Sequence, residues 1–326
     1  MKAEAPCFLA LTGPTTSGKT ELSLAIAERV DVEIISMDSR QVYARMDIGT
    51  DKVAAAARAL VPHHGIDVVE PNERYSAGRF ARDARGWIHE IRARGRLPLL
   101  VGGTGFFLRA LTDPMFAEPP ADEARLDRLR TYLAGIEPDR LARWVRRLDP
   151  ERAELAAEGG PHRMGRTIEV ALLSGRPLSW WHRRAPAEGE GLHGAVVVLD
   201  IERAEMDRRI HERVARMVDR GLVREVRSLL DGGYSLGDPG MSATGYPEMA
   251  SHLRGDGTLE EAMEEIRRST RRYARRQLTW FRHQLPESAV RIDALAPLER
   301  RVELALGAFE AAGDGRVGST TSEVVR

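Results

Sequence analysis

The chain has 326 residues, of which 42% are hydrophobic, and its 49 basic and 49 acidic side chains leave a formal net charge of zero. This length fits one large domain or a core with an insertion, and the balanced charge argues against non-specific nucleic-acid binding by the whole surface. The single cysteine excludes an internal disulfide and every C-x-x-C metal site, and no apolar run approaches the ~20 residues of a membrane span. We therefore expect a cytoplasmic protein without a signal peptide or membrane segment.

The first recognisable element is a phosphate-binding loop. Residues 13–20, GPTTSGKT, match the pattern G-x-x-x-x-G-K-[ST] in full, after an apolar run of strand length at 8–12 and before a helical pattern at 21–29. In such a loop, backbone N–H groups and the helix N-terminus bind phosphate oxygens, whereas a chance glycine-rich turn is the alternative. The phosphate-binding candidates are Gly13, Thr15, Thr16, Ser17, Gly18, Lys19 and Thr20. The Thr20 hydroxyl is also the candidate ligand of Mg²⁺.

Two further segments that read as strands end in polar residues, which we expect to lie beside this loop. The segment 32–37 reads as a strand that ends at Asp38, and in an open α/β sheet the carboxyl ends of strands face a common crevice. Asp38 is therefore a candidate catalytic carboxylate, and a turn or helix-capping aspartate is the alternative. The apolar run 97–101 is typical of a central parallel strand and ends in Gly102, Gly103 and Thr104. These glycines either admit a ligand close to the backbone, beside the Thr104 hydroxyl, or permit tight strand–helix packing.

The pattern then predicts an inserted helical domain. Helical segments at 122–133, 138–148 and 163–173 follow a proline-rich stretch, and a polar linker at 185–191 precedes a strand at 195–200. We predict a discontinuous phosphate-loop core at 1–112 and 195–312, an all-helical insertion at 113–194, and a disordered tail at 313–326. The fold class is α/β, a phosphate-loop NTPase-like core with a parallel sheet flanked by helices. Asp200, at the end of the last strand, is either a Walker-B-like acid or an ordinary strand-end residue.

Two arginine-rich helical segments follow, at 202–230 and 266–284. The second contains seven arginines and no acid. Its like charges at i,i+3 and i,i+4 spacing repel one another, which favours an anionic partner for a face that includes Arg271 and Arg275. The alternative is pairing with the glutamates at 260, 261, 264 and 265 just upstream.

These features permit two chemistries. One is a small-molecule kinase, in which Asp38 activates an acceptor hydroxyl and an arginine closes over the transferring phosphoryl group. The other is a transferase whose diphosphate is the leaving group. Both develop charge on phosphate oxygens, so the loop amides, Lys19, Mg²⁺ and an arginine serve either.

A family resemblance bears on this choice. The ordered blocks resemble those of tRNA dimethylallyltransferases over about residues 8–285: 13–20, DSRQVY at 38–43, MDIGT at 46–50, PHH at 62–64, YSA at 75–77 and VGGTG at 101–105, then 163–170, 245–246 and RRQLTWFR at 275–282. Phe107 departs from the tyrosine common in the family, and Ser242 and Pro247 stand where basic residues are common.

The resemblance implies an enzyme that moves a dimethylallyl group from dimethylallyl diphosphate to the N6 amine of the adenosine 3′ of the tRNA anticodon. From the phosphate loop we expect Mg²⁺ as the cofactor, and we expect a monomer. The resemblance also implies Asp38 as base, Thr104 at the reacting centre and Arg213 on the diphosphate. It implies tRNA contacts by Ser39, Arg40, Gln41, His162, Arg163, Met164, Gly165, Arg166, Gly245 and Tyr246. Prenylation of free adenine nucleotides is the rival within this chemistry. A non-catalytic, nucleotide-gated RNA-binding module would leave Asp38 without a role.

Overall fold

A computed structural model describes residues 6–113, 116, 122–185 and 189–313. The chain divides into two compact units, of which unit 1 is residues 1–113 with 191–326, and unit 2 is residues 114–190. The prolines at 114, 119 and 120, the centre of the second linker and the tail after residue 313 lie outside the described residues.

Unit 1 is built on a parallel sheet of six strands in the order β3-β2-β4-β1-β5-β6, counted over the described residues. The strands are β1 Phe8–Thr12, β2 Val32–Ser36, β3 His63–His64, β4 Leu97–Val101, β5 Gly194–Asp200 and β6 Val290–Asp293. Every residue of β1 and β2 is buried, as expected where helices cover both faces of a parallel sheet. The predicted α/β core with a parallel sheet is confirmed.

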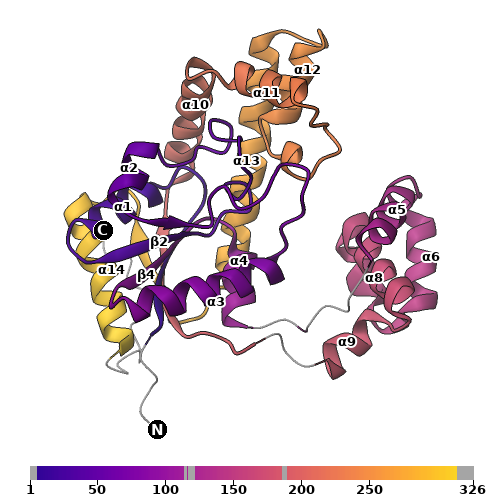
Figure 1. Cartoon of the computed structure of the whole chain (residues 1–326), viewed down its shortest axis with the longest axis horizontal. Coiled ribbons are helices and arrows are strands. Elements are labelled where there is room, and N and C mark those ends of the chain that lie inside the picture. The colour runs from indigo at the N-terminus through magenta and orange to yellow at the C-terminus, as the bar shows by residue number, and fades with distance from the viewer. Residues whose placement is uncertain (1–5, 114–115, 117–121, 186–188, 314–326) are drawn as a thin grey trace. The chain divides into compact units, whose positions relative to one another are not determined.

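The helices of unit 1 pack into hydrophobic cores, of which one surrounds the sheet and another, with residues of α11 and α12, lies away from it (Figure 1). They are α1 Lys19–Ala27, α2 Ala55–Leu60, α3 Ala77–Ala93, α4 Gly105–Thr112, α10 Arg203–Asp219, α11 Leu222–Asp231, α12 Tyr246–Leu253, α13 Leu259–Gln284 and α14 Leu298–Gly313. Helices α1 and α14 share a core with β1 and β5. The helix predicted over 202–230 is two helices, because Gly221 adopts φ 104°, a left-handed conformation that interrupts the helical hydrogen bonding.

Unit 2 has helices as its main elements, in agreement with the predicted helical insertion. They are α5 Glu123–Ala134, α6 Pro138–Leu148, α7 Ala153–Glu158, α8 Gly160–Ser174 and α9 Leu178–Arg184. Leu133, Leu141, Val145 and Ile168 form its core. Across the described part of the chain, no helix is both long and apolar enough to cross a membrane.

The register of the sheet brings three loops together. Ser36 of β2 pairs with Val101 of β4, and Val101 pairs with Leu11 of β1, so the carboxyl ends of three adjacent strands align. The Thr12 hydroxyl donates to the Gly102 carbonyl at 3.0 Å and ties two of these ends directly. The segments after β1, β2 and β4 therefore share one edge of the sheet.

A charged network stabilises the opposite end of β2. Glu33 is buried, and its carboxylate accepts hydrogen bonds from Arg94 at 2.8 and 2.9 Å, from Arg96 at 3.1 Å and from His64 at 2.7 Å. These hydrogen bonds, led by those of Arg94, outweigh burial and lower the pKa of Glu33 to about 2. The ionised carboxylate therefore stabilises the folded chain.

Glu33→Gln should lower the free energy of unfolding at pH 7 by about 2–3 kcal/mol, because it removes the charge from several charge-assisted hydrogen bonds. The folded-state pKa lies below the ordinary 4.5, so this stabilisation is present above pH 4.5 and is lost as pH falls toward 2. Denaturant unfolding from pH 7 to 3 should show the difference between parent and variant shrinking. The exposed Glu28→Gln is the control, and an equal loss in both variants would contradict the prediction.

Candidate active site

The loop after β1 presents polar groups suited to an anion. Gly18 has φ 88°, and α1 begins directly after it at Lys19. The Lys19 ammonium donates to the carbonyls of Gly13 at 2.9 Å and Pro14 at 2.7 Å. The Thr16 hydroxyl is buried without a hydrogen-bond partner among the described residues. An orphaned hydroxyl, an ammonium held on main-chain oxygens and a helix N-terminus fit a phosphate ligand.

The environment of Lys19 lowers the pKa of its ammonium group. Burial lowers the pKa of Lys19 to about 8; Asp38 acts in the opposite direction, and Arg213 lowers the pKa further. The ammonium form still predominates at pH 7. A phosphate ligand would stabilise that form further.

Helix α10 places two arginines on the loop. Arg213 donates from Nη1 to the Thr15 hydroxyl at 2.6 Å, which puts this predicted diphosphate residue on the loop. Arg209, one turn earlier, donates from Nη1 to the Thr16 carbonyl at 3.2 Å. Sequence reasoning did not single out Arg209, although i,i+4 spacing from Arg213 places both residues on one helix face.

Asp38 and Thr104 lie next to one another at the sheet edge. One Asp38 carboxylate oxygen accepts from the Arg40 N–H at 2.8 Å, which is the turn interaction foreseen as the alternative role. The Thr104 hydroxyl accepts from the Ser39 N–H at 3.0 Å. Asp38 also lines a pocket together with Lys19 and Thr20. The turn therefore orients a carboxylate that still borders the phosphate loop.

The glycines before Thr104 serve packing. A Cβ atom on Gly102 would lie 2.0 Å from the Met37 carbonyl oxygen, and one on Gly103 would lie 2.2 Å from Nε2 of Gln277. Gln277 of α13 donates to the Gly103 carbonyl at 2.8 Å and accepts from the Thr15 N–H at 2.9 Å. Of the two roles left open for these glycines, close approach of protein atoms is the one observed.

Tyr273 is a second residue of α13 at this edge. Burial raises the pKa of Tyr273 to about 12; Asp38 raises it as well, and a hydrogen bond with Thr104 lowers it. The Arg276 guanidinium lies 5.8 Å from the centre of the Tyr273 ring. Sequence reasoning gave neither Tyr273 nor Gln277 a role at the site. The signal was their i,i+4 spacing within an arginine-rich helix.

The pocket beside the loop is lined by polar and apolar side chains. Lys19, Thr20 and Asp38 are among the polar ones. The apolar lining comes from Ile34, Val53, Ile66 and Val101, and His63 also lines the pocket. His63 donates from Nδ1 to the Val61 carbonyl at 2.6 Å, and burial lowers its pKa. The imidazole is therefore neutral at pH 7 and adds no cation to the pocket.

The predicted tRNA contacts after β2 differ in their hydrogen-bond partners within the protein. Ser39, Arg40 and Gln41 are each partly exposed. Arg40 donates to the Pro239 carbonyl and the Ser242 hydroxyl, both at 3.1 Å. The Gln41 amide accepts from the Ser36 hydroxyl at 2.9 Å and donates to the Asp51 carbonyl at 3.3 Å. Both the oxygen and the nitrogen of the Gln41 side-chain amide are therefore hydrogen-bonded within the protein.

Three of the residues predicted to contact tRNA are buried in this structure. Tyr246 is fully buried and its hydroxyl donates to Glu225 at 2.7 Å, so this side chain supports a loop. Met164 lies in the core of unit 2, and Gly165 is buried in the same helix. A helix that packs on one side must bury part of any continuous motif it carries.

The other residues of 162–166 and 245–246 that were predicted to contact tRNA include exposed side chains and a helix N-cap. His162 and Arg163 are exposed, whereas Arg166 lies 3.6 Å from the Glu169 carboxylate. Gly245 is the N-cap of α12, and its N–H donates to Glu248 at 2.8 Å.

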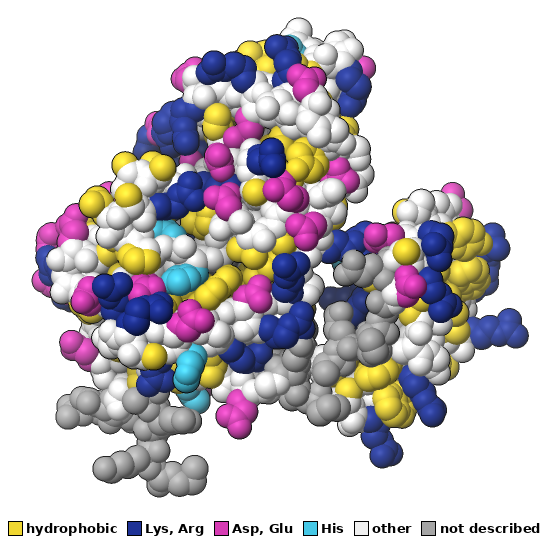
Figure 2. Space-filling view, in the orientation of Figure 1, with side chains coloured by type: hydrophobic (Ala, Val, Ile, Leu, Met, Phe, Trp, Pro, Cys, Tyr) yellow, Lys and Arg dark blue, Asp and Glu magenta, His cyan; other side chains and the backbone are white. Residues whose placement is uncertain are grey.

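The arginine face of α13 is partly neutralised. Arg271 pairs with Glu264 at 2.7 Å, while Arg275 is exposed and has no ion pair among the described residues. Pairing with upstream glutamates therefore accounts for Arg271. Figure 2 likewise shows basic and acidic side chains interspersed over the visible face of unit 1. Asp200 pairs with Arg291 of the neighbouring strand at 2.9 Å, as an ordinary strand-end aspartate does.

The parallel sheet, the loop of residues 13–20 and the cationic groups around it are those of a phosphate-loop protein. A family model described as IPP transferase matches residues 41–284, and one described as isopentenyl transferase matches residues 7–58. The chain belongs to the IPP transferase family, whose enzymes are prenyltransferases.

Relatives and solved structures agree with this assignment. The tRNA dimethylallyltransferase of Geobacillus thermodenitrificans is 42% identical over 281 residues, which covers 86% of this chain and 88% of the relative. That of Solibacter usitatus is 42% identical, over 85% of this chain and 90% of the relative. The crystal structure of the full-length tRNA isopentenylpyrophosphate transferase from Bacillus halodurans superposes with a TM-score of 0.66 at 35% identity, over 94% of this chain and 97% of that one.

Proposed function

We propose that this chain transfers the dimethylallyl group of dimethylallyl diphosphate to the N6 amine of the adenosine 3′ of the anticodon in tRNA. The observation that carries the proposal is that Asp38, on a turn held by the Thr104 hydroxyl, lines a pocket with Lys19 and Thr20, in a chain whose relatives are tRNA dimethylallyltransferases. A kinase would use the same loop. The family membership favours a diphosphate leaving group over a phosphoryl donor.

In the proposed reaction the N6 lone pair forms a bond to C1 of the dimethylallyl group. The bond from C1 to the diphosphate oxygen breaks, and its electron pair leaves with the diphosphate. The loop N–H groups, Lys19 and Arg213 bind that growing negative charge. The amine must lose a proton as the bond forms, and the Asp38 carboxylate accepts it. Thr104, hydrogen-bonded to the Ser39 N–H, fixes the turn that carries the base.

Mg²⁺ fits the diphosphate end of the proposed site. Mg²⁺ retains several waters and takes few protein ligands when phosphate oxygens are present. The exposed Thr20 hydroxyl is suited to be one such ligand. When bound, the ion would offset charge on the diphosphate oxygens. The loop and the arginines of α10 would hold the same oxygens from the protein side.

A direct test incubates the protein with tRNA, dimethylallyl diphosphate and Mg²⁺, and analyses the tRNA nucleosides by mass spectrometry. Prenylated adenosine should form without any nucleoside triphosphate. A requirement for ATP, with phosphate on the product, would establish the kinase instead. Product formed on free AMP but not on tRNA would establish the nucleotide prenyltransferase.

The apolar side chains that line the pocket should accept the hydrocarbon part of the donor. Ile34 lines the pocket, whereas Ile35, the next residue of β2, is equally buried but points to the other face of the sheet. Ile34→Ala should raise the ratio of kcat/KM for geranyl diphosphate to that for dimethylallyl diphosphate by about tenfold or more, within the range for one to several methylenes.

Ile35→Ala is the matched control, because it deletes the same carbon atoms away from the pocket. It should lower stability by a similar amount and leave the donor ratio unchanged. Equal ratios in the two variants would move the donor tail out of this pocket. Steady-state kinetics with both donors, together with a thermal unfolding curve for each variant, provide the comparison.

A further inference from the structure

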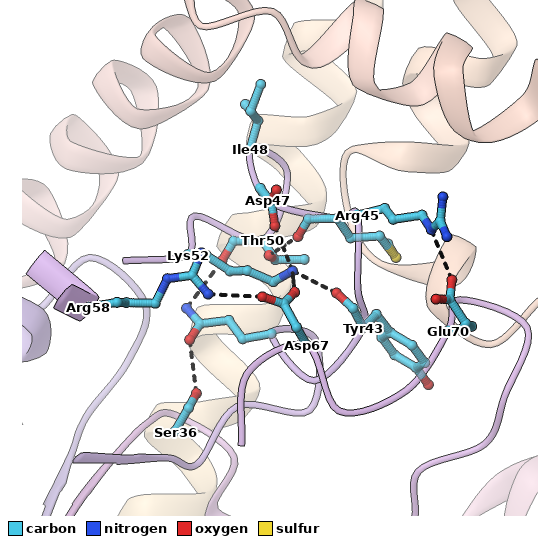
Figure 3. A network of polar contacts seen from close by, with 12 residues as sticks. Ser36, Tyr43, Arg45, Asp47, Ile48, Thr50, Lys52, Arg58, Asp67 and Glu70 are labelled. Carbon is cyan, nitrogen blue, oxygen red and sulfur yellow. Dashed lines mark hydrogen bonds and ion pairs between the residues drawn. The ribbon is translucent and has the colours of Figure 1, made fainter. Parts of the chain in front are cut away.

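The segment from Gln41 to Lys52 is held on one side by a buried ammonium. The Lys52 side chain is only 2% exposed. Figure 3 shows it extending into the loop, where it donates to the Tyr43 carbonyl at 2.7 Å, to Asp47 at 2.7 Å and to Asp67 at 2.5 Å. Asp67 is bound in turn by Arg58 at 2.9 Å. A buried ammonium that uses all three of its donors fixes the path of the chain around it.

A carboxylate from α11 holds the same segment from the other side. Glu225 accepts from the N–H groups of Asp47 at 2.9 Å, Ile48 at 2.7 Å and Gly49 at 3.0 Å. The Tyr246 ring covers Gly49 so closely that a Cβ atom there would lie 2.5 Å from a ring carbon. The loop is thus clamped by Lys52 and Glu225 together.

Asp51 stands at the end of this clamped loop. Its backbone is left-handed, with φ 54°, a conformation that few residues other than glycine adopt and that aspartate tolerates better than most. The Asp51 carboxylate pairs with Nε of Arg213 at 3.5 Å and with Nη1 of Arg220 at 3.3 Å. The Arg213 guanidinium therefore contacts Asp51 through Nε and donates from Nη1 to the Thr15 hydroxyl of the phosphate loop.

We propose that Asp51 is a positioning residue that orients the Arg213 guanidinium toward the phosphate loop, and that Lys52 and Glu225 fix the loop that carries Asp51. An unrestrained arginine must lose rotamer freedom when it binds a phosphate. Because the ion pair with Asp51 already restricts the Arg213 side chain, Arg213 loses less rotamer freedom on binding. The proposal rests on the proposed function in one respect, namely that the phosphate loop binds a diphosphate.

The experiment titrates the protein with inorganic pyrophosphate in the presence of Mg²⁺ by calorimetry. Asp51→Asn keeps the shape of the side chain and removes its charge. It should weaken pyrophosphate binding by about 2- to 12-fold, the factor that corresponds to ordering one long side chain. The same substitution in an Arg213→Ala background should have no further effect, because Asp51 then has no guanidinium to orient.

Arg220→Ala is the matched control, since Arg220 shares the Asp51 carboxylate and is exposed. It should bind pyrophosphate as the parent does. With tRNA saturating and the donor varied, Asp51→Asn should raise KM for the donor. With both substrates saturating, its single-turnover rate should stay within about twofold of that of the parent. Asp51→Ala, with an unfolding curve for each variant, separates this role from a loss of folding.

Each alternative result overturns the role of Asp51. Tighter pyrophosphate binding by Asp51→Asn would make Asp51 a competing anion, and an equal loss with and without Arg213 would mean that it acts elsewhere. An unchanged affinity of Asp51→Asn for pyrophosphate would mean that Arg213 is oriented without the Asp51 charge. Failure of the parent protein to bind pyrophosphate would instead count against the proposed function.

Discussion

Asp38→Asn should slow the chemical step by about 10²–10⁴-fold while tRNA binding persists. The substitution keeps the turn that Asp38 forms with the Arg40 N–H, since an amide oxygen accepts that hydrogen bond as a carboxylate oxygen does. It removes the group that takes the proton from N6. Single-turnover kinetics with tRNA and donor both bound isolates this step from binding.

Asp31→Asn provides the control, because Asp31 precedes β2 as Asp38 follows it, and it is exposed. The two substitutions make the same chemical change at opposite ends of one strand. A rate for Asp38→Asn within a few-fold of that for Asp31→Asn would remove Asp38 from the role of base. A loss of tRNA affinity that accounts for the whole effect would do so as well.

Lys19→Ala should lower kcat/KM for the donor by about 10²–10³-fold, the loss typical of one preorganised charge donor. Lys19 meets the diphosphate in both the ground state and the transition state, so binding and rate should both fall. In the free parent protein Lys19 deprotonates as pH rises through about 8. The parent kcat/KM should therefore decline above that pH.

The pH profile tests this assignment independently of the size of the loss. Lys19→Ala should lack the decline near pH 8, because the group that titrates there is gone. A variant that keeps the same inflection would assign it to another group. Kinetics from pH 6.5 to 9.5, with pyrophosphate affinity measured alongside, would settle the point.

The local features of this fold could be predicted from sequence because their signals are local. The loop of residues 13–20 and the strand-like runs at 32–37 and 97–101 each lie within a few residues of their own boundary signals. The rule that parallel strands end at a common edge then predicts that Asp38 lies beside the loop. The pocket lined by Lys19 and Asp38 agrees with that inference.

What sequence did not indicate depends on distant partners. Gln277 sits between arginines in a helix, and only the folded chain brings it to Thr15 and Gly103. Tyr246 and Met164 belong to family motifs, but packing decided which members of each motif would be buried. Helix α14 was not predicted, although its Val302 and Ala305 pack into the core that surrounds the sheet.

The Gln277 bridge also has a consequence for the order in which the site can be made during synthesis. The amide joins Thr15 to a residue 262 positions later, and Gly103 to the same residue 174 positions later. A growing chain exposes its phosphate loop early, yet the side chain that braces this loop against the Gly103 turn leaves the ribosome only near the end. Contacts of such long sequence separation form late in folding. An unfinished chain that lacks α13 therefore carries the phosphate-loop sequence without the Gln277 hydrogen bonds that brace it.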